Sequence, residues 1–244
     1  MNGWIYVPYS ILEGGQVTVV YDKVNHHPLK TRNQKESDTE EYDRRWVKVK
    51  RPIIITGGEL TLENLDLRFN VHRKYYEAPL QMKANNGIFI LDDFGRQMVD
   101  TETLLNRWIV PLDHRADYLT LHTGMKFEIP FDQFVIFATN LAPKKLVDEA
   151  FLRRLRYKIR IDHPTSKEYL KIFIQVCDSN NLTFDPEMFG YLMAKYKASD
   201  IDINGCHPRD LIDHILDDAH YLGWSAKITR EAIDAAWNNY FVHE

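Results

Sequence analysis

Two adjacent carboxylates at the end of an apolar segment are the first candidates for chemistry in this sequence. Asp92 and Asp93 follow the run Ile88–Leu91, which has the pattern of a strand covered on both faces. A carboxylate at the carboxyl end of a parallel strand can hold Mg²⁺, directly or through water, and a second can orient an attacking water molecule. The alternative is that the pair only begins a turn before Phe94 and Gly95, and the motif alone does not decide between the two.

A polar side chain also ends the second apolar segment of this kind. Asn140 closes the segment Phe134–Thr139. An amide beside two carboxylates at one edge of a sheet could position a water molecule or touch a terminal phosphate. Taken alone, Asn140 would be an ordinary turn-starting asparagine.

Paired guanidinium groups form a third candidate. Arg153 and Arg154 lie near the end of a predicted helix, Leu146–Leu155. Guanidinium groups stabilise charge on a phosphoryl group in transfer, often from a neighbouring subunit, although basic residues also favour helix C-termini for electrostatic reasons. The basic run continues at Arg156, Lys158 and Arg160. It would form a solvated strand edge or, as a third interpretation, contact nucleic acid.

One cation lies where a helix disfavours it. Arg209 follows Pro208 at the start of a predicted helix, where a positive charge opposes the helix dipole at a cost of roughly 0.3–1 kcal/mol. Asp210 would offset this cost. The position suggests that Arg209 has a role such as gripping a nucleotide phosphate.

Other kinds of site are not supported by the sequence. The ten histidines show no metal-ligand spacing with cysteines or carboxylates, so we expect no zinc site. No serine or cysteine occurs in a GxSxG nucleophile motif. No glycine is followed by lysine, so the phosphate-binding loop GxxxxGK[ST] does not occur in this sequence.

The amino-terminal third reads as short strands around a polar segment. Strand patterns occur at Trp4–Val7 and Val17–Tyr21, whereas 30–45 is charged, has no apolar period and predicts an exposed loop. Residues 46–69 alternate between apolar and polar, which favours two or three short antiparallel strands joined at Gly57-Gly58.

The middle of the chain mixes buried strands with helices, and the carboxyl-terminal third is helical. Thr101–Val110 and Leu146–Leu155 are predicted as helices, and Tyr157–Ile161 alternates as a strand nearer the sheet edge. In 163–244 we expect four helices. Their starts are marked by a capping box at Thr165 and Glu168, by Pro186, by Pro208 and by a cap at Thr229.

Composition bounds the class of protein. With 244 residues, 44% hydrophobic and 27% charged, the chain suits one large globular domain, or one with a small companion. No apolar run approaches 18 residues, so no membrane span is predicted. Cys177 and Cys206 make no disulfide framework, which favours a cytoplasmic location. The net charge of −4 argues against a dedicated nucleic-acid binder without excluding a local basic patch.

The order of these motifs resembles that of AAA+ ATPases. A strand ending in DD, a helix with LLNRW, a strand ending in ATN, a helix with AFLRR and a helical part with HPRDL follow one another. The segment APLQMKANNGIFILDDFGRQ is similar to the branch that includes MoxR-type and magnesium-chelatase-type ATPases. The resemblance covers about 80–244, and residues 1–30 resemble a stretch that follows the P-loop helix in uncharacterised bacterial ATPases of this type.

The resemblance implies a fold and a domain plan. The fold is an α/β, P-loop NTPase-type parallel sheet with a β-hairpin insert at about 30–75. The α/β core then spans 1–162, and a four-helix lid spans 163–244. The implied cofactors are ATP and Mg²⁺, and the implied assembly is a homo-oligomeric ring, hexameric in the full-length form.

The resemblance also implies a role for each candidate residue. Asp92 would be the Walker B magnesium ligand, and Asp93 would stand where the family has its catalytic glutamate. Asn140 would be sensor 1, Arg153 or Arg154 the arginine finger, and Arg209 sensor 2.

The sequence departs from the family pattern at two places. Aspartate at position 93 is one methylene shorter than glutamate, which puts its reach to the attacking water in question. The Walker A motif supplies most phosphate recognition, and it is missing. Because Met1 stands just before the strand that should follow the P-loop helix, we expect a truncated reading frame or a late start codon, with true loss of the motif as the alternative.

Three functions follow from this pattern. The first is the core of an ATPase that couples hydrolysis to remodelling of a protein client, chaperone-like in action and inactive as this chain alone. The second is a nucleotide-free, degenerate module used for assembly or interaction. The third is a nucleic-acid remodeller in which 46–69 and 156–160 contact a threaded strand; the acidic balance ranks it below protein remodelling.

Overall fold

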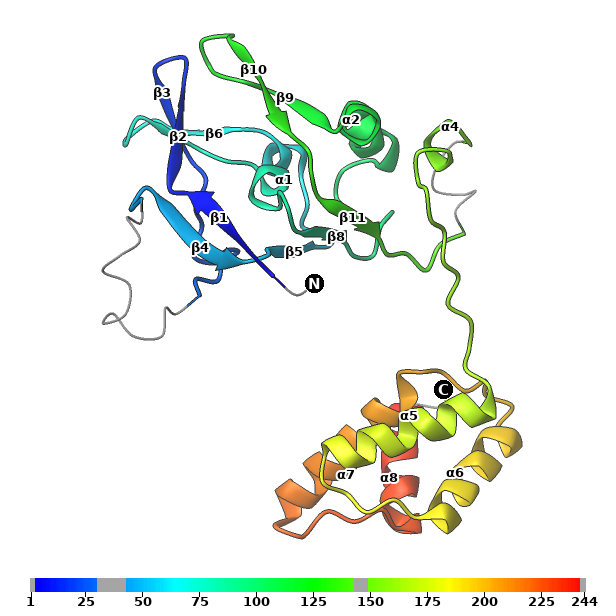
Figure 1. Ribbon diagram of the computed structural model, residues 1–244. Helices are drawn as coiled ribbons and strands as arrows, with labels where there is room; N and C mark the ends of the chain where they lie inside the picture. The colour runs from blue at the N-terminus through cyan, green and yellow to red at the C-terminus, as the bar shows by residue number, and fades with distance from the viewer. Residues whose placement is uncertain (1–2, 30–42, 143–148, 242–244) are drawn as a thin grey trace. The chain divides into compact units, whose positions relative to one another are not determined.

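The computed structural model describes residues 3–29, 43–142 and 149–241, and the chain divides into two compact units. Residues 1–157 form the α/β unit and residues 158–244 form the helical unit. Figure 1 shows the strands in the first unit and helices α5 to α8 in the second. Within the described residues, no helix is long and apolar enough to cross a membrane.

A three-stranded parallel sheet lies at the centre of the α/β unit. Strand β8 (Ile88–Leu91) lies between β5 (Ile53–Thr56) and β11 (Phe134–Phe137), and all three run in the same direction. Phe89 and Leu91 are fully buried because they lie in one core cluster with Leu104 and Trp108, which come from residues 101–114. Both predicted strands form, and Phe89 and Leu91 make β8 a largely buried strand. The prediction that β11 is buried was wrong, because Phe134 is 53% exposed, the other three residues of β11 are only partly buried, and β8 is its one described neighbour.

The segment before β8 differs from its prediction. We expected antiparallel strands joined at Gly57-Gly58, and this was wrong, because β5 pairs with β8 in parallel. The two glycines instead begin a loop that leads to the short 3-10 helix η1 (Leu62–Leu65). Apolar alternation reports that one face of a strand is buried and carries no information about the direction of its neighbour. Thus β5, predicted within the insert, is an edge strand of the central sheet.

The remaining strands form three further sheets. Gly14 and Gly15 both have positive φ and make the turn of an antiparallel hairpin between residues 10–13 and 16–19. A four-stranded sheet has the order β2 (Ser10–Glu13), β3 (Gln16–Val19), β7 (Tyr75–Glu77) and β6 (Arg68–Asn70). Two antiparallel pairs are β1 (Trp4–Pro8) with β4 (Trp46–Lys50), and β9 (Ala116–Thr120) with β10 (Lys126–Pro130).

The helices of the α/β unit are α1 (Leu80–Lys83), α2 (Thr101–His114) and α4 (Glu149–Leu152). The α2 helix is confirmed and extends four residues beyond the predicted end at Val110. Of the predicted helix Leu146–Leu155, residues 146–148 lie outside the described residues, as does most of the predicted loop 30–45.

The strand predicted at Tyr157–Ile161 does not form. Ile159 and Ile161 are 86% and 92% exposed, and no described strand pairs with the segment. Arg160 instead forms an ion pair with Asp162. An alternating pattern becomes a strand only when a neighbouring strand accepts its backbone hydrogen bonds.

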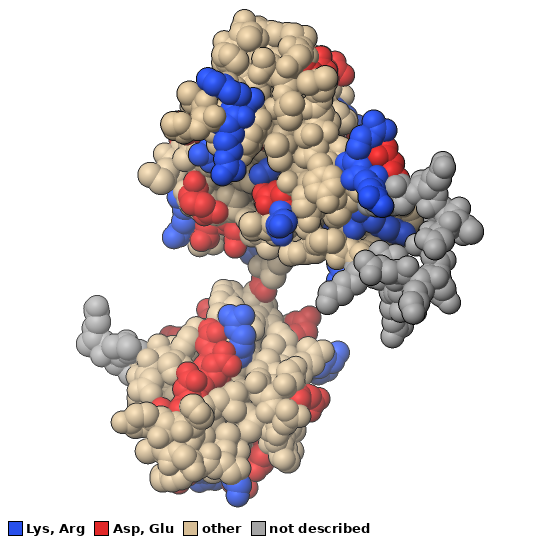
Figure 2. Space-filling model, turned by 90° about the vertical axis from the view of Figure 1, so that its left-hand side faces the viewer, with Lys and Arg blue, Asp and Glu red and all other residues tan. Residues whose placement is uncertain are grey.

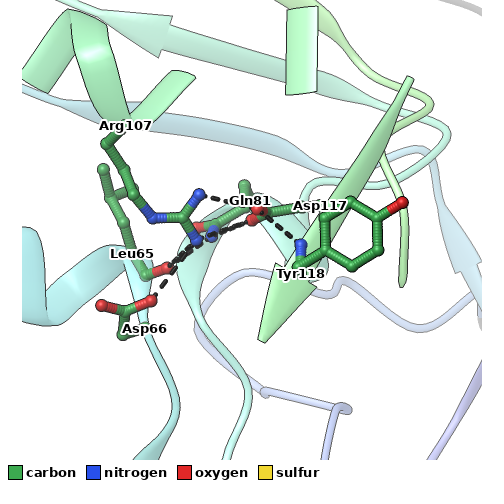
Figure 3. A network of polar contacts seen from close by, with 6 residues as sticks. All are labelled: Leu65, Asp66, Gln81, Arg107, Asp117 and Tyr118. Carbon is green, nitrogen blue, oxygen red and sulfur yellow. Dashed lines mark hydrogen bonds and ion pairs between the residues drawn. The ribbon is translucent and has the colours of Figure 1, made fainter. Parts of the chain in front are cut away.

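A buried ion pair joins α2 to β9 (Figure 3). Arg107 donates to both carboxylate oxygens of Asp117, at 2.6 and 2.9 Å. Gln81 from α1 donates to the same carboxylate, and Arg107 also reaches the carbonyl oxygen of Leu65 and the exposed carboxylate of Asp66. This network connects four elements that surround the central sheet.

The helical unit consists of α5 (Ser166–Ser179), α6 (Pro186–Ala198), α7 (His207–Leu222) and α8 (Arg230–Tyr240). All four predicted helices are confirmed. Thr165 and Glu168 form the capping box, and Asp185 and Thr229 cap α6 and α8. The helices enclose their own core, which includes Tyr169, Phe173, Leu192, Ile212 and Trp237.

Candidate active site at the carboxyl edge of the parallel sheet

The carboxyl ends of three parallel strands converge at one edge of the central sheet. The backbone N–H of Asp92 donates to the carbonyl oxygen of Thr56 at the end of β5, at 2.8 Å. Beyond β11, the N–H of Ala138 donates to Leu91, and Phe94 donates back to Ala138 at 2.7 Å. The loops that follow the three strands are therefore held together by backbone hydrogen bonds.

The two aspartates occupy a tight turn directly after β8. Asp93 has a φ of 49°, a left-handed conformation that aspartate tolerates better than most residues. Its N–H donates to the Asp92 carboxylate at 3.0 Å. Both aspartates are exposed, so the turn holds their side chains at the sheet edge.

Gln97 closes this turn from the other side. Its side-chain oxygen accepts from the N–H of Gly95 at 2.8 Å. Its side-chain amide donates to the carbonyl oxygens of Asp92 and Asp93, at 3.1 and 3.3 Å. The glutamine in the DDFGRQ motif thus fixes the backbone that carries both carboxylates.

Asn140 lies on the adjacent loop. The preceding residue, Thr139, donates its hydroxyl to the carbonyl oxygen of Phe94 at 2.8 Å and accepts from the N–H of Leu141. This bond ties the end of β11 to the turn after β8, and Asn140 is exposed beside it. The structure therefore brings Asp92, Asp93 and Asn140 to the same sheet edge, as the strand order requires.

The sequence analysis missed one carboxylate at this edge. Glu59, just beyond β5, accepts from the N–H of Gly57 at 3.0 Å and from the hydroxyl of Thr56 at 3.1 Å. The backbone hydrogen bond from Gly57 is the main cause that lowers the pKa of Glu59, so this carboxylate is ionised at neutral pH. The signal was present as an apolar strand followed by Gly-Gly-Glu, and it was lost when β5 was predicted as part of an antiparallel hairpin.

The paired arginines follow α4 and are anchored through its aromatic residue. Phe151 is 3% exposed and packs edge-on against Phe137, the last residue of β11. Arg154 forms an ion pair with Asp113 near the end of α2, at 2.8 Å. Arg153 is the more exposed of the two. The guanidinium group of Arg154 is therefore held by an ion pair within the unit, whereas Arg153 lies at the surface of the unit.

Arg209 belongs to the helical unit, whereas the other candidate residues belong to the α/β unit. It lies in the first turn of α7 and contacts the carboxylate of Asp210 at 3.3 Å. The same aspartate accepts a hydrogen bond from Tyr240. Asp210 offsets the unfavourable charge of Arg209, as expected from the sequence.

The donor set at the sheet edge fits Mg²⁺ bound with a phosphate ligand. Mg²⁺ bound in this way commonly takes one or two carboxylates and completes its coordination with phosphate oxygens and water. Asp92 and Asp93 are adjacent, exposed carboxylates and meet this need. Among the described residues, no group of three or more His, Cys, Asp or Glu side chains could form a metal cage.

Solved structures of NtrX from Brucella abortus are similar to this chain. One aligns over 79% of this chain and 45% of the NtrX chain, at a TM-score of 0.54 and 12% identity. A second, in complex with ADP, aligns over 74% and 42%, at a TM-score of 0.51 and 14% identity. The chain thus spans less than half the length of these NtrX chains.

This likeness and the parallel sheet together decide the fold class. The chain has the fold of AAA+ ATPases. At 12–14% identity the likeness shows the fold and not the reaction. A complex of the magnesium chelatase subunits BchI and BchD aligns at a TM-score of only 0.38, with 14% identity over 79% of this chain and 71% of that one, which is too weak to decide the branch within the AAA+ fold.

The helical unit matches a family model of its own. The model is described as a domain of unknown function (DUF8689) and covers residues 165–239, from the cap of α5 into α8. Comparison with curated proteins finds no match. The family model therefore marks the helical unit as a domain and gives it no function.

Proposed function

We propose that this chain supplies the hydrolytic side of an ATP site in an AAA+ ATPase that remodels a protein client. The observation that carries the proposal is the Asp92-Asp93 turn beside Asn140 at the carboxyl edge of a parallel sheet. Open α/β sheets bind ligands at this edge. The similarity in fold to NtrX, one structure of which is a complex with ADP, supports a nucleotide as the ligand.

Each residue at the sheet edge would have a separate role in hydrolysis. Asp92 would hold Mg²⁺, which when bound neutralises charge on the phosphates. Asp93 would orient the attacking water, and Asn140 would donate its amide to the terminal phosphate. The hydrogen bonds from Gln97 fix the backbone of the turn. This fixed backbone would hold Asp93, whose side chain is shorter than that of glutamate, in one place. Arg153, the more exposed of the two arginines, would act on a neighbouring subunit of a ring.

The Walker A motif supplies most of the phosphate recognition at such a site. No GxxxxGK[ST] motif occurs in the 244 residues, and among the described strands β11 is paired on one side only, by β8. We therefore propose that the phosphate-binding loop belongs to a segment outside these residues. Arg209 would then link bound nucleotide to movement of the helical unit, which acts as a lid.

The test compares this chain with the longer reading frame. If the DNA upstream of codon 1 encodes GxxxxGK[ST], the longer protein should hydrolyse ATP. Asp93→Asn should then lower the rate by roughly 10²–10⁴-fold while ATP binding persists. Asp132→Asn is the matched control, because Asp132 is exposed and precedes β11 at the opposite sheet edge. Equal loss in both variants would contradict the assigned role of Asp93.

A second function, a nucleotide-free assembly module, is favoured by the absent phosphate loop alone. It predicts no ATPase activity in any form of the protein, and no upstream GxxxxGK[ST] motif. Calorimetry on the 244-residue chain tests an expectation that the two functions share, namely that this chain alone does not bind ATP tightly. Sub-micromolar ATP binding by this chain would exclude the nucleotide-free module, and it would also contradict the proposal that the phosphate loop lies outside the chain.

A further inference from the structure

The antiparallel pair of β1 and β4, here called the β1–β4 ribbon, has two faces of different chemistry. Trp4 pairs with Lys50 and Tyr6 with Lys48 across the ribbon. Because side chains alternate along a strand, these residues share the outer face. The inner face carries Val7 and other aliphatic side chains that pack into a core cluster. The inner face therefore holds the ribbon in place, and the outer face lies at the surface of the unit.

Large aromatic side chains lie exposed on the outer face. Trp4 is 48% exposed, Tyr6 45% and Trp46 40%. Lys48 places its ammonium group 3.8 Å from the centre of the Trp4 ring, and Trp4 meets Tyr6 edge-on at 5.3 Å between ring centres. Rigid ring surfaces and a cation thus lie side by side on one strand pair.

The charge on the β1–β4 ribbon has the opposite sign to that of the chain. Neither strand contains an acidic residue, and β4 contributes Lys48 and Lys50, whereas the whole chain has a net charge of −4. Figure 2 shows lysine and arginine side chains at several places on the α/β unit, with acidic side chains among them. A local basic patch on an acidic protein attracts a polyanion.

We propose that the outer face of the β1–β4 ribbon binds single-stranded nucleic acid. Bases would stack on the exposed rings of Trp4, Tyr6 and Trp46, and phosphates would lie against Lys48 and Lys50. Aromatic platforms interleaved with cations are the means by which proteins hold single strands without reading their sequence. An acidic peptide would satisfy the lysines and would make no use of the exposed ring surfaces. Binding at this surface does not depend on ATP.

The experiment measures fluorescence anisotropy of a labelled oligothymidylate of about fifteen nucleotides, the upper end of the site size of one binding module, with this chain in low to moderate salt. We expect an affinity that falls with salt. Trp4→Ala and Trp46→Ala should each weaken binding by about 5- to 150-fold, the range for loss of one stacked base. The double variant K48Q/K50Q should make the slope of log K against log salt shallower by about 1.4, which is two phosphate contacts.

Matched controls lie in the helical unit. Trp224→Ala removes a tryptophan that is 72% exposed, and K167Q/K171Q removes two exposed lysines. Circular dichroism of each variant establishes that the fold is kept. The proposal is overturned if the oligonucleotide does not bind in low salt, or if the controls lose as much affinity as the ribbon variants. Heparin carries charge without bases. Binding of heparin by the wild type at the affinity of the oligonucleotide would also overturn it, because the rings would then add nothing to binding.

Discussion

Breaking the buried ion pair between Arg107 and Asp117 should destabilise the α/β unit far more than breaking the exposed ion pair between Arg107 and Asp66. Asp117 is 2% exposed and accepts four hydrogen bonds: two from Arg107, one from Gln81 and one from the N–H of Tyr118. Arg107→Met removes two of them and leaves a buried carboxylate without its counter-ion. Asp66, by contrast, contacts the same guanidinium at 3.3 Å with its side chain 60% exposed.

Asp117 is buried and Asp66 is exposed, and this difference in burial determines how much the free energy of unfolding falls when each ion pair is broken. Loss of one member of a buried ion pair costs about 3–5 kcal/mol, because the remaining charge is desolvated and uncompensated. Loss of an exposed partner costs at most about 1 kcal/mol. With a urea slope of about 2 kcal/mol/M, Arg107→Met should lower the unfolding midpoint by roughly 1.5–2.5 M, and Asp66→Ala by less than about 0.5 M.

Urea unfolding followed by tryptophan fluorescence measures both shifts, and Trp108, a fully buried residue next to Arg107, contributes to that signal from the α/β unit. The double variant R107M/D117L completes a mutant cycle. Its destabilisation should be smaller than the sum of the two single variants by at least about 1 kcal/mol, since each single variant leaves the other member of the pair without its counter-ion and the double variant leaves neither. Equal midpoints for Arg107→Met and Asp66→Ala, or additive single effects, would refute the assignment of this pair as the bond that joins α2 to β9.

Two further predictions concern titration and capping. His26 is 1% exposed, accepts from the N–H of Asp22 and pairs with the carbonyl oxygen of Lys83, and burial lowers its pKa. The unfolded chain then takes up a proton below about pH 6.5 that the folded chain resists. The free energy of unfolding of the α/β unit should therefore fall as the pH drops from about 7.5 to about 5.5. Hydrogen exchange of peptides from this unit should report a weaker pH dependence in His26→Gln than in His27→Gln, the exposed neighbour; identical profiles would refute the argument. In the helical unit, Thr165→Ala removes the capping box of α5 and should cost about 1 kcal/mol, which thermal unfolding monitored by circular dichroism would detect, whereas an unchanged midpoint would mean that α5 does not depend on this cap.

Features that depend on adjacent residues were predictable from the sequence. Neighbouring residues alone specify three such features: the capping box at Thr165 and Glu168, the Asp185-Pro186 start of α6 and the apolar run of β8. The convergence of Asp92, Asp93 and Asn140 followed from a single rule, that parallel strands end at one edge. Their chemical roles remain predictions, because position at an edge does not specify a reaction.

Features that depend on a distant partner were missed or wrong. Glu59 belongs to the site only because β5 pairs with β8, a pairing that the local pattern does not encode. The β9–β10 hairpin, with its five-residue loop from Leu121 to Met125, carries no two-residue turn signal of the strongest type. Tyr157–Ile161 has the alternation of a strand and no described neighbour to pair with.

The separate cores of the two units have a kinetic consequence. In the helical unit, each helix forms its own hydrogen bonds locally, and α7 packs against α8, the next helix along the chain. In the α/β unit, Trp4 pairs with Lys50, Thr18 with Tyr76 and Ile88 with Phe134, and each pairing must first close a long stretch of chain at an entropic cost. The unit that is synthesised later is thus the one that can fold faster, and the sheet edge that carries the aspartates is assembled in the slower step.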